Sequence, residues 1–248
     1  MKLILQKPFK GNFHLSQRFG AYLKVYADLG MKGHNGHDWA LPFDTPIYSA
    51  HDGIVIFADY DNSRGLGVEV RTKEKFDFEQ GLYLAKTMYW HLRDGGAVVT
   101  VGQEVKAGDL LGYSGSTGLS TGNHLHFSLK LIDDNFKTIN RTNGYTGAID
   151  QITMYDYGFK YQFMKVLKKG SLGLGVTALQ KVCGFFGFFD FNKDAVPVFG
   201  QKTSDALARF QTFVIPPETF SKSELDMIAS ETTQAGKKTR AFINNLLK

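Results

Sequence analysis

The chain has 248 residues, of which 43% are hydrophobic and 21% are charged. This apolar content is enough for a folded core and excludes an intrinsically disordered chain. The formal charge of +5 is compatible with an anionic partner such as nucleic acid, a membrane or a cell-wall polymer. Cys183 is the only cysteine, which excludes a disulfide framework and a cysteine-based zinc cluster.

The first twenty residues carry basic and polar side chains and lack the apolar run of a signal peptide. We therefore expect synthesis in the cytoplasm without a signal peptide. No stretch of the sequence approaches a membrane span, so we expect no membrane insertion.

The next part of the chain reads as short strands separated by glycine turns. Strand-like runs lie at 54–57, 68–70, 88–92 and 98–101. The polar stretches at 59–67 and 73–81 are expected to be loops. Many short, closely spaced strands favour an antiparallel sheet, either a sandwich or a barrel-like form.

From about residue 157 the apolar positions follow helical spacing. They do so within 176–183 and 203–214, and 237–248 is typical of a final basic helix. Ser221 and Glu224 have the spacing of a capping box at a helix start. The sequence predicts a multi-domain chain, with a mainly antiparallel β domain at 1–160 and a small, all-α, three-helix domain with an extension at 161–248.

Charge divides the chain in the same place. Residues 1–157 hold 16 basic and 17 acidic side chains, whereas residues 158–248 hold 13 basic and 7 acidic ones. All seven histidines lie in the first part, the last being His126. The two parts are therefore expected to have different roles.

The histidines near residues 34 and 124 have the spacing of a metal site. In an extended chain side chains alternate between faces, so His34 and Asp38 share one face, and His124 and His126 share one as well. Imidazole and carboxylate suit zinc, and three protein ligands leave a fourth position for water. The surplus imidazoles, His91 and one of the His124/His126 pair, could orient that water or move its proton. The alternative is a set of ordinary surface and turn histidines.

The other histidines lack such partners. His37 has the opposite parity to His34 and Asp38, so we expect its ring to face away from a metal site. His51 precedes a turn signal and is expected to be solvated. His14 has no partner at a useful spacing.

Ordered motifs across residues 13–157 resemble the lysostaphin/LytM-type zinc endopeptidases of peptidoglycan. The motifs that carry this resemblance are His34-x-Gly36-x-Asp38, Trp90-His91-Leu92, and the run from Gly115 to His124-Leu125-His126-Phe127. The resemblance implies that His34, Asp38 and His126 bind Zn²⁺ and that His91 and His124 are the catalytic pair. The implied reaction is hydrolysis of a peptide bond in the stem or cross-bridge of bacterial peptidoglycan, either Gly-Gly or D-alanyl-diaminopimelate.

The helical part is similar, over about residues 163–214, to the small three-helix peptidoglycan-binding module. With no signal peptide and a wall-directed activity, we expect a monomeric phage endolysin that acts on the cell wall after release. One alternative is a non-catalytic protein of the same fold that binds peptidoglycan or activates an amidase. Another, a nucleic-acid-binding protein, depends only on the positive charge, and we expect no nucleic-acid partner.

Overall fold

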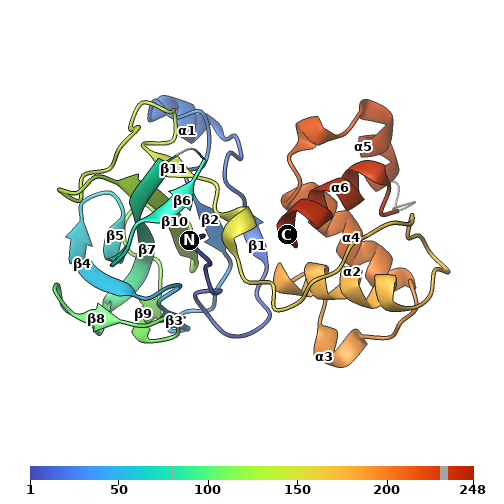
Figure 1. The fold of residues 1–248 in the computed structure, drawn as a ribbon, viewed down its shortest axis with the longest axis horizontal. Coiled ribbons are helices and arrows are strands. Elements are labelled where there is room, and N and C mark those ends of the chain that lie inside the picture. The colour runs from blue at the N-terminus through green and yellow to red at the C-terminus, as the bar shows by residue number, and fades with distance from the viewer. Residues whose placement is uncertain (80, 230–233) are drawn as a thin grey trace. The chain divides into compact units, whose positions relative to one another are not determined.

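The computed structural model describes residues 1–79, 81–229 and 234–248. The chain forms two compact units. The first consists of Met1–Gly11 and Ser16–Asp156, and the second of Asn12–Leu15 and Tyr157–Lys248. The blue-to-green part of the ribbon in Figure 1 is rich in strands, and its orange-to-red part is helical.

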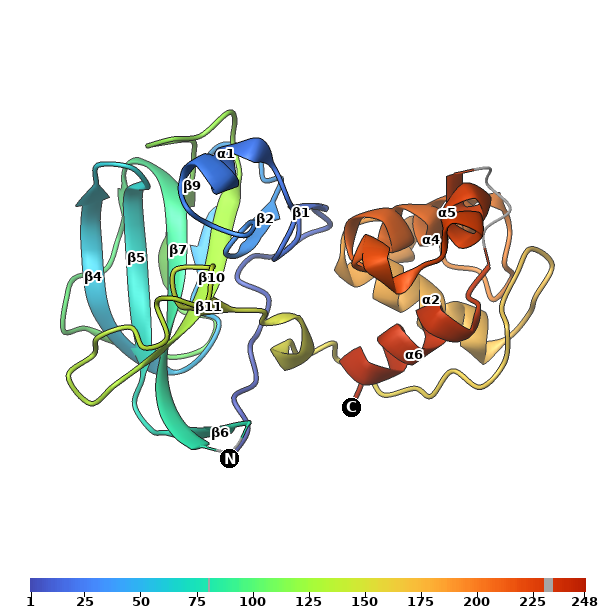
Figure 2. The ribbon, with the colours of Figure 1, turned by 90° about the horizontal axis from the view of Figure 1, so that it is seen from above.

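Within the described residues, eleven strands join in one sheet. They are β1 (Leu15–Gln17), β2 (His37–Trp39), β3 (Pro46–Tyr48), β4 (Gly53–Asp61), β5 (Gly65–Thr72), β6 (Phe76–Phe78), β7 (Gly81–Ala97), β8 (Glu104–Val105), β9 (Leu110–Ser114), β10 (Leu125–Ile132) and β11 (Ala148–Ile149). The main path through the sheet runs β1-β2-β10-β7-β5-β4-β8. The pairs of β10 with β2, of β7 with β10 and β5, and of β5 with β4 are all antiparallel, as the sequence predicts. Figure 2 shows β4, β5, β7 and β10 following one another across the sheet.

Alternation along β10 separates two faces of the sheet. Phe127 and Leu129 are buried on the core face, while His126 and Lys130 lie on the opposite face. The register carries this division across the sheet, since His126 stands opposite Trp90 and Lys130 opposite Lys86 on β7. The candidate metal-binding histidine and a lysine four residues further on therefore share one face.

Three expected elements differ from the structure. The strand predicted at 98–101 is wrong: β7 ends at Ala97, and although Val99 is buried, its neighbours Val98 and Val101 are 50% and 65% exposed. The loop predicted at 73–81 contains β6, which pairs with the start of β7 because Phe76 is buried there. The loop predicted at 59–67 is a hairpin, in which β4 reaches Asp61 and β5 begins at Gly65.

The helices confirm the helical pattern of the sequence. They are α1 (Lys24–Asp28), η1 (Ile152–Met154), α2 (Leu174–Phe185), α3 (Phe191–Asp194), α4 (Gln201–Phe213), η2 (Pro217–Thr219), α5 (Lys222–Ala229) and α6 (Lys237–Leu246). In the second unit α2 and α4 pack together, and the Gln180 side-chain amide donates to Thr203 Oγ1 at 2.8 Å. At the start of α5 the backbone N–H of Ser221 donates to the Glu224 carboxylate at 2.7 Å, and that of Glu224 donates to Ser221 Oγ at 3.4 Å. The predicted capping box is thus confirmed.

Over the described ranges of the chain, none of the helices is long and apolar enough to cross a bilayer.

Candidate metal centre

His34, Asp38 and His126 meet at one point on the sheet. Asp38 lies on β2 directly opposite His126 on β10, and His34 precedes Asp38 by four residues. His34 Nε2 is 3.0 Å from His126 Nδ1 and 3.2 Å from Asp38 Oδ1, and His126 Nδ1 is 2.9 Å from Asp38 Oδ1. Three potential ligand atoms therefore form a nearly equilateral triangle.

This triangle fits a tetrahedral metal ion. Ligands about 2.0–2.1 Å from a tetrahedral centre lie about 3.3 Å from one another, close to the separations observed here. His34 Nδ1 is 3.2 Å from the Arg18 carbonyl, so Nδ1–H donates to that oxygen and the Nε2 lone pair points to the triangle. With two imidazoles and one carboxylate, the donor set is one that zinc prefers.

Electrostatics at the triangle keep its groups ready to bind a cation. Burial alone would raise the pKa of Asp38, but His34 and His126 outweigh it and hold that pKa well below its usual range. Burial lowers the pKa of His126 to about 4, against the opposing pull of Asp38. An ionised carboxylate and a neutral imidazole are the forms that coordinate a metal.

His91 and His124 lie beside the triangle, as the resemblance implies. Their ring centroids are 4.5 Å apart, and the centroid of His91 is 6.1 Å from that of His126. His124 Nε2 is 3.9 Å from Asp38 Oδ1. The structure therefore brings all five predicted site residues together in the first unit.

Backbone carbonyls set the orientation of both rings. His91 Nδ1 lies 2.8 Å from the Thr117 carbonyl, and His124 Nδ1 lies 2.8 Å from that of Gly122. Each Nδ1–H donates to its carbonyl, so each Nε2 carries a lone pair. Sequence reasoning missed Thr117 and Arg18, because they act through backbone oxygens that every residue type possesses.

The segment that carries Thr117 is fixed by close packing against the β4–β5 turn. Thr117 Oγ1 donates to the Leu92 carbonyl at 2.6 Å and accepts from the Leu66 N–H at 2.9 Å. A Cβ on Gly118 would lie 2.3 Å from the Gly65 nitrogen, so the two backbones approach too closely for a side chain there. His91 itself has φ of +63°, a strained value that persists only where the surroundings enforce it.

The remaining histidines are outside the triangle. His37 is fully buried and its Nδ1 is 3.1 Å from Tyr155 Oη, in agreement with the prediction that it faces away. The prediction that His51 is solvated is wrong: it is 4% exposed, with Nε2 3.0 Å from Thr87 Oγ1 and Nδ1 2.8 Å from the Asp52 carbonyl. Folding of the sheet over the turn buries this ring.

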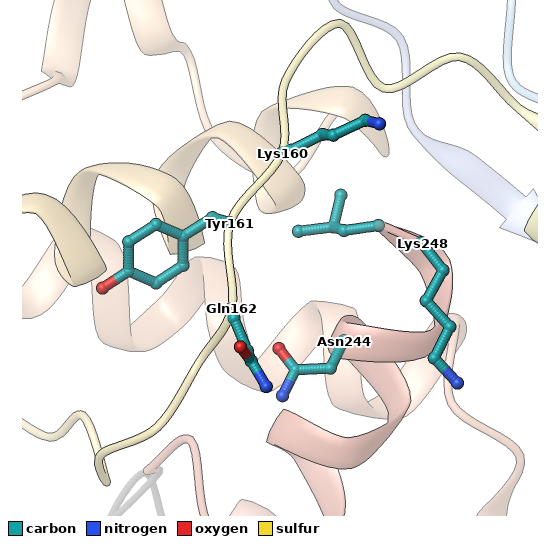
Figure 3. Close-up of a pocket in the computed structure, with 6 residues that line it drawn as sticks. Lys160, Tyr161, Gln162, Asn244 and Lys248 are labelled. Atoms are coloured by element: carbon teal, nitrogen blue, oxygen red, sulfur yellow. The ribbon is translucent and has the colours of Figure 1, made fainter.

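The second unit contains a hollow of its own, of about 380 Å³ (Figure 3). It is lined by Lys160, Tyr161, Gln162, Asn244, Leu247 and Lys248. Asn244 is held there by its bonds to the backbone of Phe163, at 2.7 and 3.1 Å. The hollow contains no histidine and is a separate feature from the metal centre.

Comparison with known proteins identifies the class of the first unit. Residues 32–140 match Peptidase family M23, a range that includes all five predicted site residues. The chain therefore carries an M23 domain, which confirms the resemblance found in the sequence.

Individual relatives agree with the family match. The chain is 36% identical over 118 residues to the glycyl-glycine endopeptidase ALE-1 of Staphylococcus capitis, covering 47% of this chain and 29% of the relative. It is 35% identical over 96 residues to the peptidoglycan DD-endopeptidase ShyA of Vibrio cholerae, covering 39% and 20%. The matched segments thus span less than a third of the length of these relatives. The catalytic domain of lysostaphin from Staphylococcus simulans aligns with a TM-score of 0.44 and 26% identity, over 57% of this chain and 90% of that one.

Proposed function

We propose that this chain is a zinc-dependent endopeptidase that hydrolyses peptide bonds of bacterial peptidoglycan. The observation that carries the proposal is the triangle of His34, Asp38 and His126 with His91 and His124 beside it. Relatives named as peptidoglycan and glycyl-glycine endopeptidases support the substrate class.

His34, Asp38 and His126 are proposed to hold the zinc ion. When bound, zinc would act as a Lewis acid toward the scissile carbonyl and lower the pKa of a water to about 7. The chain supplies the rest of the site by keeping the ligand atoms within about 3 Å of one another through the pairing of β2 with β10.

His91 and His124 are proposed to move the protons. Because Nδ1–H of each ring is held by a carbonyl, Nε2 is free to accept a proton from water as the water oxygen bonds to the carbonyl carbon. The proton then passes to the leaving amine when the C–N bond breaks. The second proton of the water is released when the new carboxylic acid ionises and is taken up by the amine. The products are therefore a carboxylate and an ammonium group, and water is the only other reactant consumed.

The helical part, residues 161–248, is proposed to hold the enzyme on the wall through a three-helix module built around α2 and α4. The excess of basic over acidic side chains beyond residue 157 favours contact with an anionic polymer. Lys168 and Lys169 are both exposed. Replacing both by Gln should weaken binding of the full chain to sacculi and reduce its salt dependence, whereas Lys2→Gln with Lys106→Gln should not.

The phage endolysin role and the monomeric state stay predictions from the sequence. Both are open to direct measurement, by lysis from within a host cell and by sedimentation of the purified chain.

Incubation of the zinc-loaded full chain with purified sacculi tests the proposed activity. Release of soluble fragments is expected, and mass spectrometry of the new ends identifies the bond. His126→Ala should lose both zinc and hydrolysis, while His91→Ala should keep zinc and lose about 10²–10⁴ in rate; His14→Ala is the matched control. A chain that binds stoichiometric zinc but releases nothing would contradict the proposal, and one that binds no zinc would favour the non-catalytic alternative.

A further inference from the structure

Lys86 and Lys130 lie on the same face of the sheet as the metal centre, and the charges of Arg64 and Arg141 lie near Lys130. We define the basic cluster as Arg64, Lys86, Lys130 and Arg141. Lys130 shares the His126 face of β10, and Lys86 stands opposite Lys130 on β7. Burial, followed by the nearby charges of Lys86, Arg64 and Arg141, disfavours a proton on Lys130 and lowers its pKa to about 8, against the opposing charge of Glu69.

Two carboxylates accompany the basic cluster, and both are already engaged. Lys86 Nζ is 2.6 Å from Glu69 Oε2, and Arg64 is 3.6 Å from Glu69 Oε1. Asp61 pairs with Arg64 at 2.9 Å. Four basic groups thus meet two acidic ones, which leaves the cluster with an excess of positive charge.

Lys130 lacks the kind of salt bridge that the described part of the structure gives Lys86 and Arg64. Its ammonium group donates to the neutral hydroxyl of Thr146 at 3.2 Å, and among the described residues no carboxylate forms a salt bridge with it. The same hydroxyl already accepts a hydrogen bond from Asn35, at 3.0 Å. A partly buried ammonium in such surroundings is stabilised strongly by an anion.

The distance from the metal centre is set by the strand. His126 and Lys130 are four residues apart on β10, which corresponds to about 13 Å at about 3.3 Å per residue. An extended peptide covers that distance with about four residues. Ser128 of β10 and Met88 of β7 lie between them on the same face, and both side chains are buried.

We propose that Lys130, supported by Lys86 and Arg64, forms a substrate subsite for a carboxylate about four residues from the scissile bond. The inference rests on the proposed function. Within that function, it narrows the substrate to peptidoglycan whose stem peptides bear a free carboxylate. A neutral glycine cross-bridge without such a group nearby would be cut less efficiently. The competing role for Lys130 is structural, to hold the loop that carries Thr146.

Steady-state hydrolysis by the zinc-loaded full chain tests the subsite. The probes are two synthetic cross-linked stem-peptide dimers that differ only in a terminal carboxylate or its carboxamide. The expected KM of the wild type is about 10-fold lower for the carboxylate peptide, because a hydrogen bond to a charged group is lost with the amide. Lys130→Met should abolish this ratio, Lys130→Arg should restore most of it, and Lys106→Met, at an exposed position, should leave it unchanged.

Each result decides between the two roles. Equal KM values for the two peptides in the wild type, or a ratio that survives Lys130→Met, would overturn the subsite. If the wild type cuts neither the peptides nor sacculi, the proposed function fails. Calorimetric titration of each peptide into the wild-type chain then tests the subsite separately, because preferential binding of the carboxylate peptide needs no catalysis. A merely structural Lys130 would lower the melting temperature on substitution without changing the ratio between peptides.

Discussion

Gly36 lies between His34 and Asp38, the two proposed zinc ligands of the first motif, and a side chain at this position would collide with the candidate site. A Cβ at this position would lie 2.7 Å from His126 Cε1 and 2.7 Å from the Phe127 carbonyl oxygen. Ordinary contacts begin at 3.4 Å, so Gly36→Ala must displace the imidazole, the strand or its own loop by about 0.7 Å.

That displacement exceeds what a metal site tolerates. Ligand distances in zinc sites hold to about 0.2 Å, and the obstacle on one side is backbone, which moves less readily than a side-chain end. We therefore expect Gly36→Ala to weaken zinc binding by about 10–100-fold, the loss typical of perturbing groups that orient a ligand. Hydrolysis at limiting zinc should fall in proportion.

Competition with a chromophoric chelator measures the zinc affinity of the full chain, and circular dichroism verifies that the variant is folded. Gly122→Ala is the matched control, since it lies two residues before His124 but a Cβ there meets nothing within 4 Å. Wild-type zinc affinity in a folded Gly36→Ala chain would refute the reasoning, and so would an equal loss in Gly122→Ala.

Three further predictions follow from the contacts and pKa values. Thr117→Val removes two hydrogen bonds of Thr117 Oγ1 and should lower kcat about 10-fold, with the zinc content measured by mass spectrometry unchanged; loss of zinc would contradict it. Burial lowers the pKa of Lys7 to about 7 from 10.5, so the folded state binds fewer protons than the unfolded state between these values. Urea unfolding should therefore show wild-type stability rising from pH 7 to 10 more steeply than that of Lys7→Met; parallel curves would contradict this. Burial raises the pKa of the Cys183 thiol, so a thiol reagent such as dithiobis(nitrobenzoate) should react with Cys183 only after denaturation. Rapid reaction of the native chain would be inconsistent with burial of this thiol.

The residues of the candidate site could be predicted because their chemistry is carried by residue type and local parity. His34 and Asp38, like His124 and His126, are separated by an even number of positions, which predicts a shared face wherever the chain is extended. In the structure β2 begins at His37, so His34 reaches the site from the segment before the strand. Helices α2, α4 and α6 could be predicted equally well, since helical periodicity is a local property of the sequence.

Features that depend on burial in the folded chain could not be predicted from local sequence patterns. Val98 and Val101 have strand-forming side chains, yet they remain outside the sheet because no apolar surface covers them. His51 shows the opposite error, since it was predicted to be solvated but is buried, with its ring against the β7 residue Thr87.

The sequence by itself predicted the five candidate site residues and the kinds of ligand they offer, and it indicated the helical second part and the resemblance to the family. Only the tertiary structure decided that β2 pairs with β10, which sets Asp38 opposite His126, and that the Thr117 carbonyl orients His91. It also brought Lys130 onto the face of the metal centre with Lys86 and Arg64 around it. The physical reason is that pairing register and backbone hydrogen bonds join residues far apart in the chain, and neither leaves a signature in residue type.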